Sequence, residues 1–125
     1  MKFAKYTFLI AAVYGVLALL PQYFMEEKNG RDFPPAITHP EYYYGFIGVA
    51  LAWQIVFLII AKNPLKYRLL MIPAILEKAS FAAAAIVLFL SERLSTVMLG
   101  AGLIDLILGI LFVIAYLKTP ESNEN

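Results

Sequence analysis

The chain contains 125 residues, of which 62% are hydrophobic and 15% are charged, and its formal net charge at pH 7 is +1. Globular domains are roughly 45–50% apolar, so this composition is typical of a membrane protein, and the near-neutral charge gives no basis for nucleic-acid binding. With no cysteine and one histidine, the chain excludes disulfides, thiolate chemistry and multi-histidine metal or haem centres, and we expect no metal or other cofactor.

Four apolar runs of 20 to 24 residues follow one another, at about 6–25, 42–61, 69–91 and 94–117. Each is long enough to cross ~30 Å of hydrocarbon as a helix. No small-residue cleavage site follows the first run, so we expect a membrane helix there and not a removed signal peptide. The sequence therefore predicts an all-α integral membrane protein: one domain, 1–125, folded as an antiparallel bundle of four transmembrane helices.

The segments between the runs predict the connections and the orientation. An outer loop at 26–41 is the one long connection, and a polar tail occupies 118–125. Because the other two connections are short, we expect the second, third and fourth helices to be antiparallel neighbours. Six basic residues flank one side and three the other, which predicts cytoplasmic termini and an external 26–41 loop. The six are Lys2, Lys5, Lys62, Lys66, Arg68 and Lys118; the three are Lys28, Arg31 and Arg93.

Helix starts and packing faces also have sequence signals. Thr38 and Glu41 have the spacing of a capping box, and Asn63-Pro64 predicts a third helix that begins as early as Pro64. Small residues recur at three- and four-residue spacing, which lets helices approach closely either within the bundle or across a homodimer. They are Ala11 and Gly15; Gly45, Gly48 and Ala52; and Ala101, Gly102 and Gly109.

Each of the four runs contributes a polar side chain at a similar depth. At 1.5 Å per residue, these side chains fall in one layer roughly two turns thick. They are Tyr14, Gln54, the adjacent Glu77 and Lys78, and Asp105. Ionisable residues at this depth are expensive and indicate a functional site by default.

Lys78 and Asp105 are natural ion-pair partners, about one turn apart on neighbouring helices. Glu77 projects about 100° away from Lys78, which directs it toward Gln54 or Tyr14. One interpretation is a buried pair that fixes helix register. The other is a polar pocket for a small molecule, a lipid head group or a proton, with Trp53 as an aromatic wall.

The outer loop offers a weaker candidate set in Asp32, His39 and Glu41. These residues either close the mouth of a pocket or are solvated side chains. A single histidine beside prolines does not indicate a metal site, and we predict none.

Several stretches resemble a group of small uncharacterised bacterial four-helix membrane proteins. They are Arg31–Gly45, Ala52-Trp53-Gln54, Leu76-Glu77-Lys78 and Leu103–Leu106. The resemblance implies a multi-pass protein of the bacterial inner membrane and no activity. Small multidrug transporters are similar in length, but their functional glutamate lies in the first helix, where this chain has no charge.

The function favoured by these patterns is binding of a small hydrophobic or amphipathic molecule in the buried polar layer. Alternatives are a structural or accessory subunit of a membrane complex, a membrane enzyme, and a proton-coupled transporter that uses Glu77 and Asp105. The expected partners are the lipid bilayer, a small apolar ligand, and a second copy or another membrane protein. The sequence favours binding over catalysis without deciding between them.

Overall fold

The structure is a computed structural model that describes residues 2–121, so Met1 and residues 122–125 of the predicted tail lie outside the described part. Every regular element in that part is helical, which confirms the all-α class. The elements are α1 (Lys2–Leu19), the 3₁₀ helix η1 (Leu20–Phe24), α2 (Glu26–Asp32), α3 (Pro40–Lys62), the 3₁₀ helix η2 (Arg68–Leu70), α4 (Met71–Leu90) and α5 (Thr96–Lys118). Four segments are long and apolar enough to span a membrane: Lys2–Phe24, Pro40–Lys62, Arg68–Leu90 and Thr96–Lys118.

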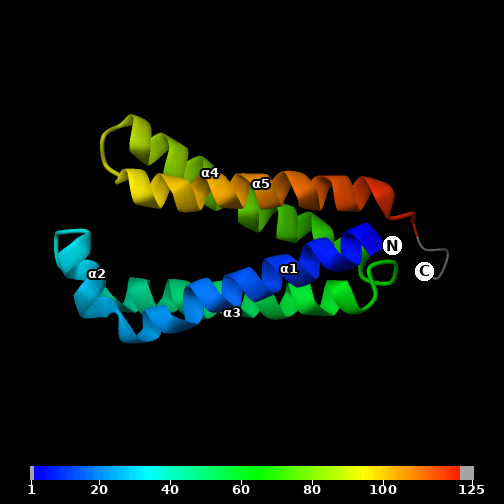
Figure 1. The fold of residues 1–125 in the computed structure, drawn as a ribbon, viewed down its shortest axis with the longest axis horizontal. Helices are drawn as coiled ribbons and strands as arrows, with labels where there is room; N and C mark the ends of the chain where they lie inside the picture. Colours follow the sequence, from blue (N-terminus) through cyan, green and yellow to red (C-terminus); the bar gives the residue numbers. More distant parts are fainter. Residues whose placement is uncertain (1, 122–125) are drawn as a thin grey trace.

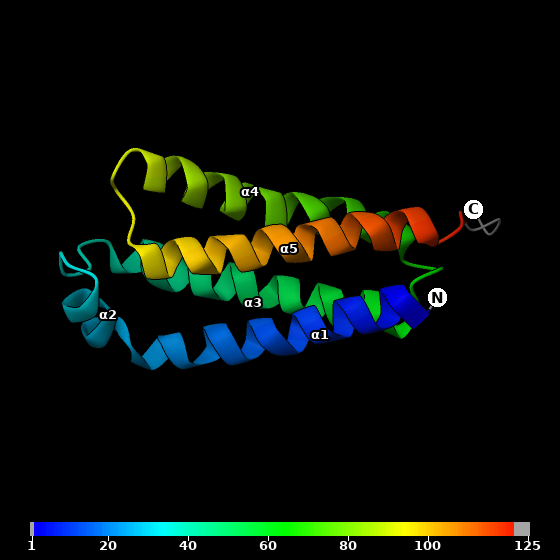
Figure 2. The same cartoon turned by 45° about the horizontal axis from the view of Figure 1, so that its top comes forward.

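The four long helices form two antiparallel pairs, α1 with α3 and α4 with α5 (Figure 1). Contacts between α1 and α5 join the two pairs, and α2 lies at the end opposite to the two termini (Figure 2). The predicted neighbours α4 and α5 are packed along their length. The predicted contact between the second and third spans is small, because α3 and α4 diverge after their connecting turn.

Three phenylalanines hold the two pairs together near the end that carries the termini. Phe8, Phe57 and Phe112 come from α1, α3 and α5 and are fully buried. The Phe8 and Phe112 rings stack with centroids 4.1 Å apart, and Phe57 meets Phe112 edge-on at 5.1 Å. Offset and edge-on geometries are the favourable ones for aromatic pairs. This cluster therefore ties three of the four spans to one another.

Large apolar side chains cover the outside of the bundle. Leu17 on α1, Leu76 on α4 and Ile107 on α5 are 71%, 67% and 59% exposed. An all-apolar exterior of this kind is unfavourable in water and is matched by lipid chains. The exterior therefore agrees with four membrane-spanning helices.

Two predicted helix-start signals do not form as expected, although α3 does begin with proline in its first turn, as predicted. Helix α3 begins at Pro40 with His39 as its N-cap and no side-chain cap bond, so the Thr38–Glu41 capping box does not form. Glu41 instead faces His39, with Oε1 of Glu41 3.3 Å from Nδ1 of His39. Asn63 does accept a hydrogen bond from the Lys66 amide, at 3.2 Å, but the chain continues as turns and α4 begins only at Met71.

The outer loop contains a short helix that hydrophobic periodicity did not predict. Helix α2 is polar throughout, and its Lys28 forms an i,i+4 ion pair with Asp32. Hydrogen bonding to Lys28 lowers the pKa of the exposed Asp32 carboxyl below its ordinary value. Tyr43 ties this region to α3, since its hydroxyl donates to the Gln22 carbonyl at 2.6 Å and accepts from Asn29.

Candidate functional site

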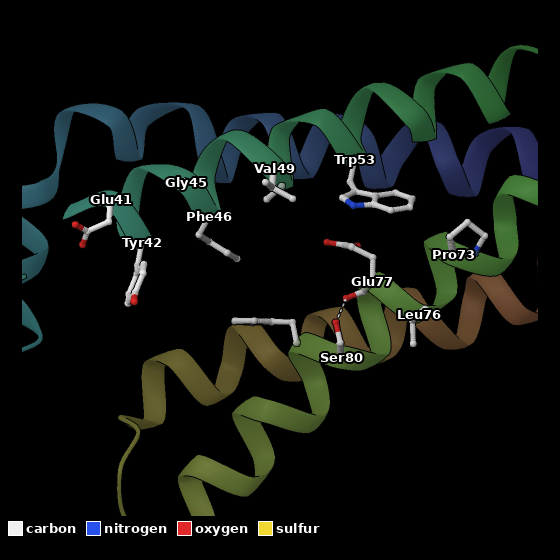
Figure 3. A pocket seen from close by; sticks show the side chains of 12 residues that line it. Glu41, Tyr42, Gly45, Phe46, Val49, Trp53, Pro73, Leu76, Glu77 and Ser80 are labelled. Carbon is white, nitrogen blue, oxygen red and sulfur yellow. Dashed lines mark hydrogen bonds between the residues drawn. The ribbon is translucent and has the colours of Figure 1, made fainter. Parts of the chain in front are cut away.

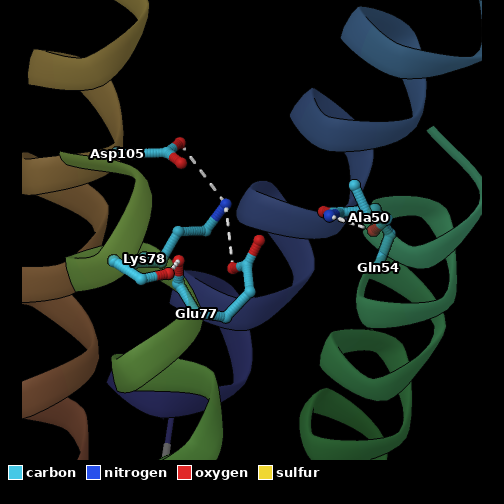
Figure 4. Close-up of polar contacts among 6 residues, drawn as sticks. Ala50, Gln54, Glu77, Lys78 and Asp105 are labelled. Carbon is cyan, nitrogen blue, oxygen red and sulfur yellow. Dashed lines mark hydrogen bonds and ion pairs between the residues drawn. The ribbon is translucent and has the colours of Figure 1, made fainter. Parts of the chain in front are cut away.

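The polar layer centres on Lys78, whose ammonium lies between two carboxylates (Figure 4). Its Nζ is 3.5 Å from Oδ1 of Asp105 and 3.6 Å from Oε2 of Glu77. The predicted Lys78–Asp105 pair is thus confirmed. Glu77 was expected to turn away from Lys78, but both side chains are long enough to converge despite their 100° offset around α4. The Lys78 side chain is only 4% exposed.

Small residues on α5 allow α4 to bring this cluster together. A Cβ at Gly109 would lie 3.3 Å from the Cβ of Lys78, and one at Gly102 would overlap the Cβ of Ala85. The predicted small-residue stripe of α5 is therefore a packing face within the bundle. Gly45 on α3 differs, because no described atom lies within 4 Å of a Cβ built there.

The cluster borders a small, partly open cavity of about 150 Å³ between the four long helices, which we call the internal cavity. Its polar lining includes Tyr14 from α1, Gln54 from α3, Glu77 and Lys78 from α4, and Asp105 from α5. The structure thus brings together five of the six residues predicted for ligand binding. Gln22 also lines this cavity; it was missed because it lies near the end of the first apolar run, away from the predicted layer.

Two acceptor atoms at this cavity have no hydrogen-bond partner among the described residues. They are Oε1 of Gln54 and Oε2 of Glu77; the latter has only the 3.6 Å ion-pair contact with Nζ of Lys78, which is too long for a hydrogen bond. Gln54 is 1% exposed, and its Nε2 donates to the Ala50 carbonyl at 2.8 Å, which leaves Oε1 free. Gly15 makes room for this carboxamide, because a Cβ there would overlap it. Buried acceptors are normally paired, so whatever occupies the cavity is expected to offer donors to them.

A second and larger space is an open groove of about 750 Å³ between α3 and α4 (Figure 3). It exists because these two helices diverge. Trp53, the sixth predicted ligand-binding residue, lines this groove with Glu77 and not the internal cavity. Ser80 lies beside Glu77, and its hydroxyl donates to the Glu77 carbonyl at 3.0 Å. The volume is within the roughly 300–1,000 Å³ typical of small-molecule sites.

Four residues line both spaces and so form the partition between them: Phe46, Ala50, Glu77 and Phe81. The Phe46 and Phe81 rings have centroids 6.3 Å apart. Glu77 is the single ionisable member of this partition. Its side chain therefore borders both the groove and the smaller cavity.

The outer-loop candidates are only partly at the site. Glu41 lines the outer end of the groove, whereas Asp32 and His39 line neither space. Asp32 is paired with Lys28, and the His39 ring stacks on Tyr42 with centroids 4.9 Å apart. Within residues 2–121, no group of three or more acidic or histidine side chains is arranged to hold a metal ion.

Fold and site together define the class of protein. The chain is a multi-pass integral membrane protein with four candidate spans, and a lysine buried among them forms ion pairs. No protein-family model, no curated protein and no solved structure shows a significant match to it.

Proposed function

We propose that the protein binds a small amphipathic molecule. Its apolar part lies in the groove between α3 and α4, and its polar end reaches Glu77. The observation that carries this proposal is the position of Glu77, which borders both spaces and whose Oε2 accepts no hydrogen bond and has only a 3.6 Å ion-pair contact with Lys78.

The chemistry of the two spaces supports an amphipathic ligand over a wholly apolar one. The groove is lined mainly by carbon, including Trp53, Phe46 and Phe81, and suits an acyl or aryl portion. Oε1 of Gln54 accepts no hydrogen bond from the described residues, and Oε2 of Glu77 has only its long contact with Lys78, so the polar end is expected to carry N–H or O–H groups. The distances from Lys78 Nζ to the Glu77 and Asp105 oxygens both exceed the ~2.7–2.9 Å of a tight charge-assisted hydrogen bond. The carboxylates of Glu77 and Asp105 therefore retain capacity to accept hydrogen bonds from a ligand.

Trp53 provides a direct test, because it is the only tryptophan in the chain and lines the groove beside Glu77. A brominated dodecylamine added to the protein in lipid nanodiscs should quench Trp53 fluorescence saturably. Glu77→Gln keeps the size of the side chain but removes its charge, and a hydrogen bond to a charged group contributes ~1.5–3 kcal/mol. We therefore expect binding to weaken about tenfold or more.

The matched control is Glu92→Gln, which removes a carboxylate from the exposed turn after α4. This variant should quench like the wild type. Quenching in the wild type that rises linearly, as by simple partitioning into lipid, would contradict the proposal. It would favour the structural or accessory-subunit alternative.

We also propose that both termini face the cytoplasm of a bacterium whose inner membrane holds the protein. Of the nine basic residues that flank the spans, six lie at the end of the bundle that carries the termini and three at the opposite end. The bacterial membrane is suggested by the sequence resemblance alone.

Since the chain has no cysteine, single Gly30→Cys and Lys66→Cys variants report which side of the membrane each position faces. An impermeant maleimide should label only Gly30→Cys in intact cells; the reverse pattern would invert the topology.

A further inference from the structure

We infer that the ligand carries one positive charge on an alkylammonium group, and that its binding displaces one proton from the Glu77–Lys78–Asp105 cluster. This inference rests on the proposed function and specifies the chemical class of the ligand. It follows from three observations: the charges around the two spaces, the enclosure of the cluster, and the groups available to a cation.

The cluster contains two carboxyl groups and only one cation. From the other helices, Tyr14 and Gln54 face the same cavity and carry no positive charge. At the groove, the additional titratable groups are Glu41 and Tyr42, at its outer end. Among the described residues, no second lysine or arginine lines either space. With both carboxyl groups ionised, the cluster would carry one net negative charge.

A net charge is costly where these side chains lie. The side chains of Lys78, Asp105 and Glu77 are 4%, 14% and 20% exposed, in the middle of two spans. An ionised group taken out of water must be paired, or it becomes neutral by exchanging a proton. The ligand-free cluster is thus expected to hold one proton shared between its two carboxyl groups, as coupled sites do.

The site is suited to exchange that proton for an ammonium group. Oε1 of Gln54 accepts no hydrogen bond from the described residues, and Oε2 of Glu77 has only its 3.6 Å contact with Lys78, so both oxygens have capacity to accept from an R–NH₃⁺ group. The Phe46, Phe81 and Trp53 rings line the approach, and aromatic faces attract cations. Lys78 already illustrates this arrangement, since its Nζ lies 5.2 Å from the centre of the Phe57 ring.

The exchange balances without electron transfer. The O–H bond of the protonated carboxyl breaks, and its proton leaves to water. The resulting carboxylate pairs with the ammonium. The net charge is therefore zero for the protonated, ligand-free cluster and also for the deprotonated cluster with its bound ammonium. A neutral ligand of the same length has no charge to replace the proton.

Isothermal titration calorimetry of the protein in nanodiscs tests this inference. Titrations in phosphate and in Tris, whose ionisation enthalpies differ, give the number of protons released per ligand. The probes are dodecylammonium, dodecyltrimethylammonium, which has no ionisable proton of its own, and neutral dodecanol. For both cations we expect release that approaches about one proton per ligand at the lower end of the neutral range, with weaker binding of dodecyltrimethylammonium because it has no N–H to donate. Dodecanol should release none and bind more weakly.

Two variants separate the exchange from a folding defect. In Glu77→Gln and in Asp105→Asn, Lys78 balances the one remaining carboxylate, so each ligand-free cluster is neutral without a bound proton. Both variants should release no proton and bind the cations at least tenfold more weakly than the wild type. Glu92→Gln should behave like the wild type, and circular dichroism confirms that each variant is folded.

The outcomes distinguish this inference from the proposed function. If the brominated amine and a brominated alcohol of the same length both quench Trp53 saturably, with equal affinity or without proton release, the cation exchange is wrong and the amphiphile site stands. If neither probe quenches Trp53 saturably, the proposed function fails and the exchange fails with it.

Discussion

Replacing Lys78 with methionine is expected to destabilise the folded bundle by about 3 kcal/mol at neutral pH. Removing one partner of a buried ion pair costs about 3–5 kcal/mol, because the other partner is left charged and unpaired. Here Lys78 is the shared partner of Glu77 and Asp105, so its loss leaves two carboxyl groups facing each other. The expected value lies at the lower end because these groups can take up protons. The decrease in the free energy of unfolding should therefore become smaller as the pH is lowered.

The free energy of unfolding is measured by titrating the reconstituted protein with sodium dodecyl sulphate and following helix content. Lys62→Met is the matched control, because Lys62 is exposed at the end of α3 and should cost little. Adding Asp105→Asn to Lys78→Met should recover part of the loss. A Lys78→Met variant as stable as the wild type would remove the basis for a buried ionic cluster.

The spans could be predicted from the sequence because run length and composition decide whether a helix crosses a bilayer. The ends of the helices were harder to predict, since they depend on competing local contacts. Glu41 faces His39 instead of completing a box with Thr38. Helix α2 was missed because its stabilising contacts, such as Lys28–Asp32, are polar and local. Neither the Glu41–His39 contact nor the polar contacts of α2 produce a hydrophobic periodicity in the sequence.

The polar layer was predictable for a related reason. The fixed rise of an α-helix converts sequence distance into depth, which placed Tyr14, Gln54, Glu77 and Asp105 at one level before any packing was known. These side chains do line one cavity. The convergence of Glu77 and Lys78 was not predictable, because it depends on side-chain rotamers and not on the helical wheel.

The groove could not be predicted because it depends on which helix pairs pack closely. Small residues bring α1 to α3, where Gly15 meets Gln54, and α4 to α5, where Gly102 meets Ala85. The small residues of α3 had the same spacing, yet Gly45 lines the groove and contacts no helix. Spacing alone identifies a surface on which another helix can pack, but not whether one does.

Crowding this groove beside Glu77 is expected to weaken ligand binding without disturbing the fold. Ser80→Leu adds an apolar side chain to an exposed position of α4 that borders the groove next to Glu77. A single surplus methylene in a shaped apolar site costs ~1–3 kcal/mol, so we expect the affinity for the brominated amine to fall tenfold or more. Stability should change by no more than ~0.5 kcal/mol, because the new side chain faces an open space.

Ala79→Leu is the control for this substitution, since it adds a leucine at nearly the same depth of α4. Ala79 is exposed but lines neither the groove nor the cavity, so Trp53 quenching should be unchanged. Ser80→Leu tests whether the ligand needs the space in the groove, whereas Glu77→Gln tests whether it needs the negative charge. The affinity of an amphiphile bound as proposed should fall in both variants. Binding that is lost in Glu77→Gln but kept in Ser80→Leu would move the ligand out of the groove and into the internal cavity.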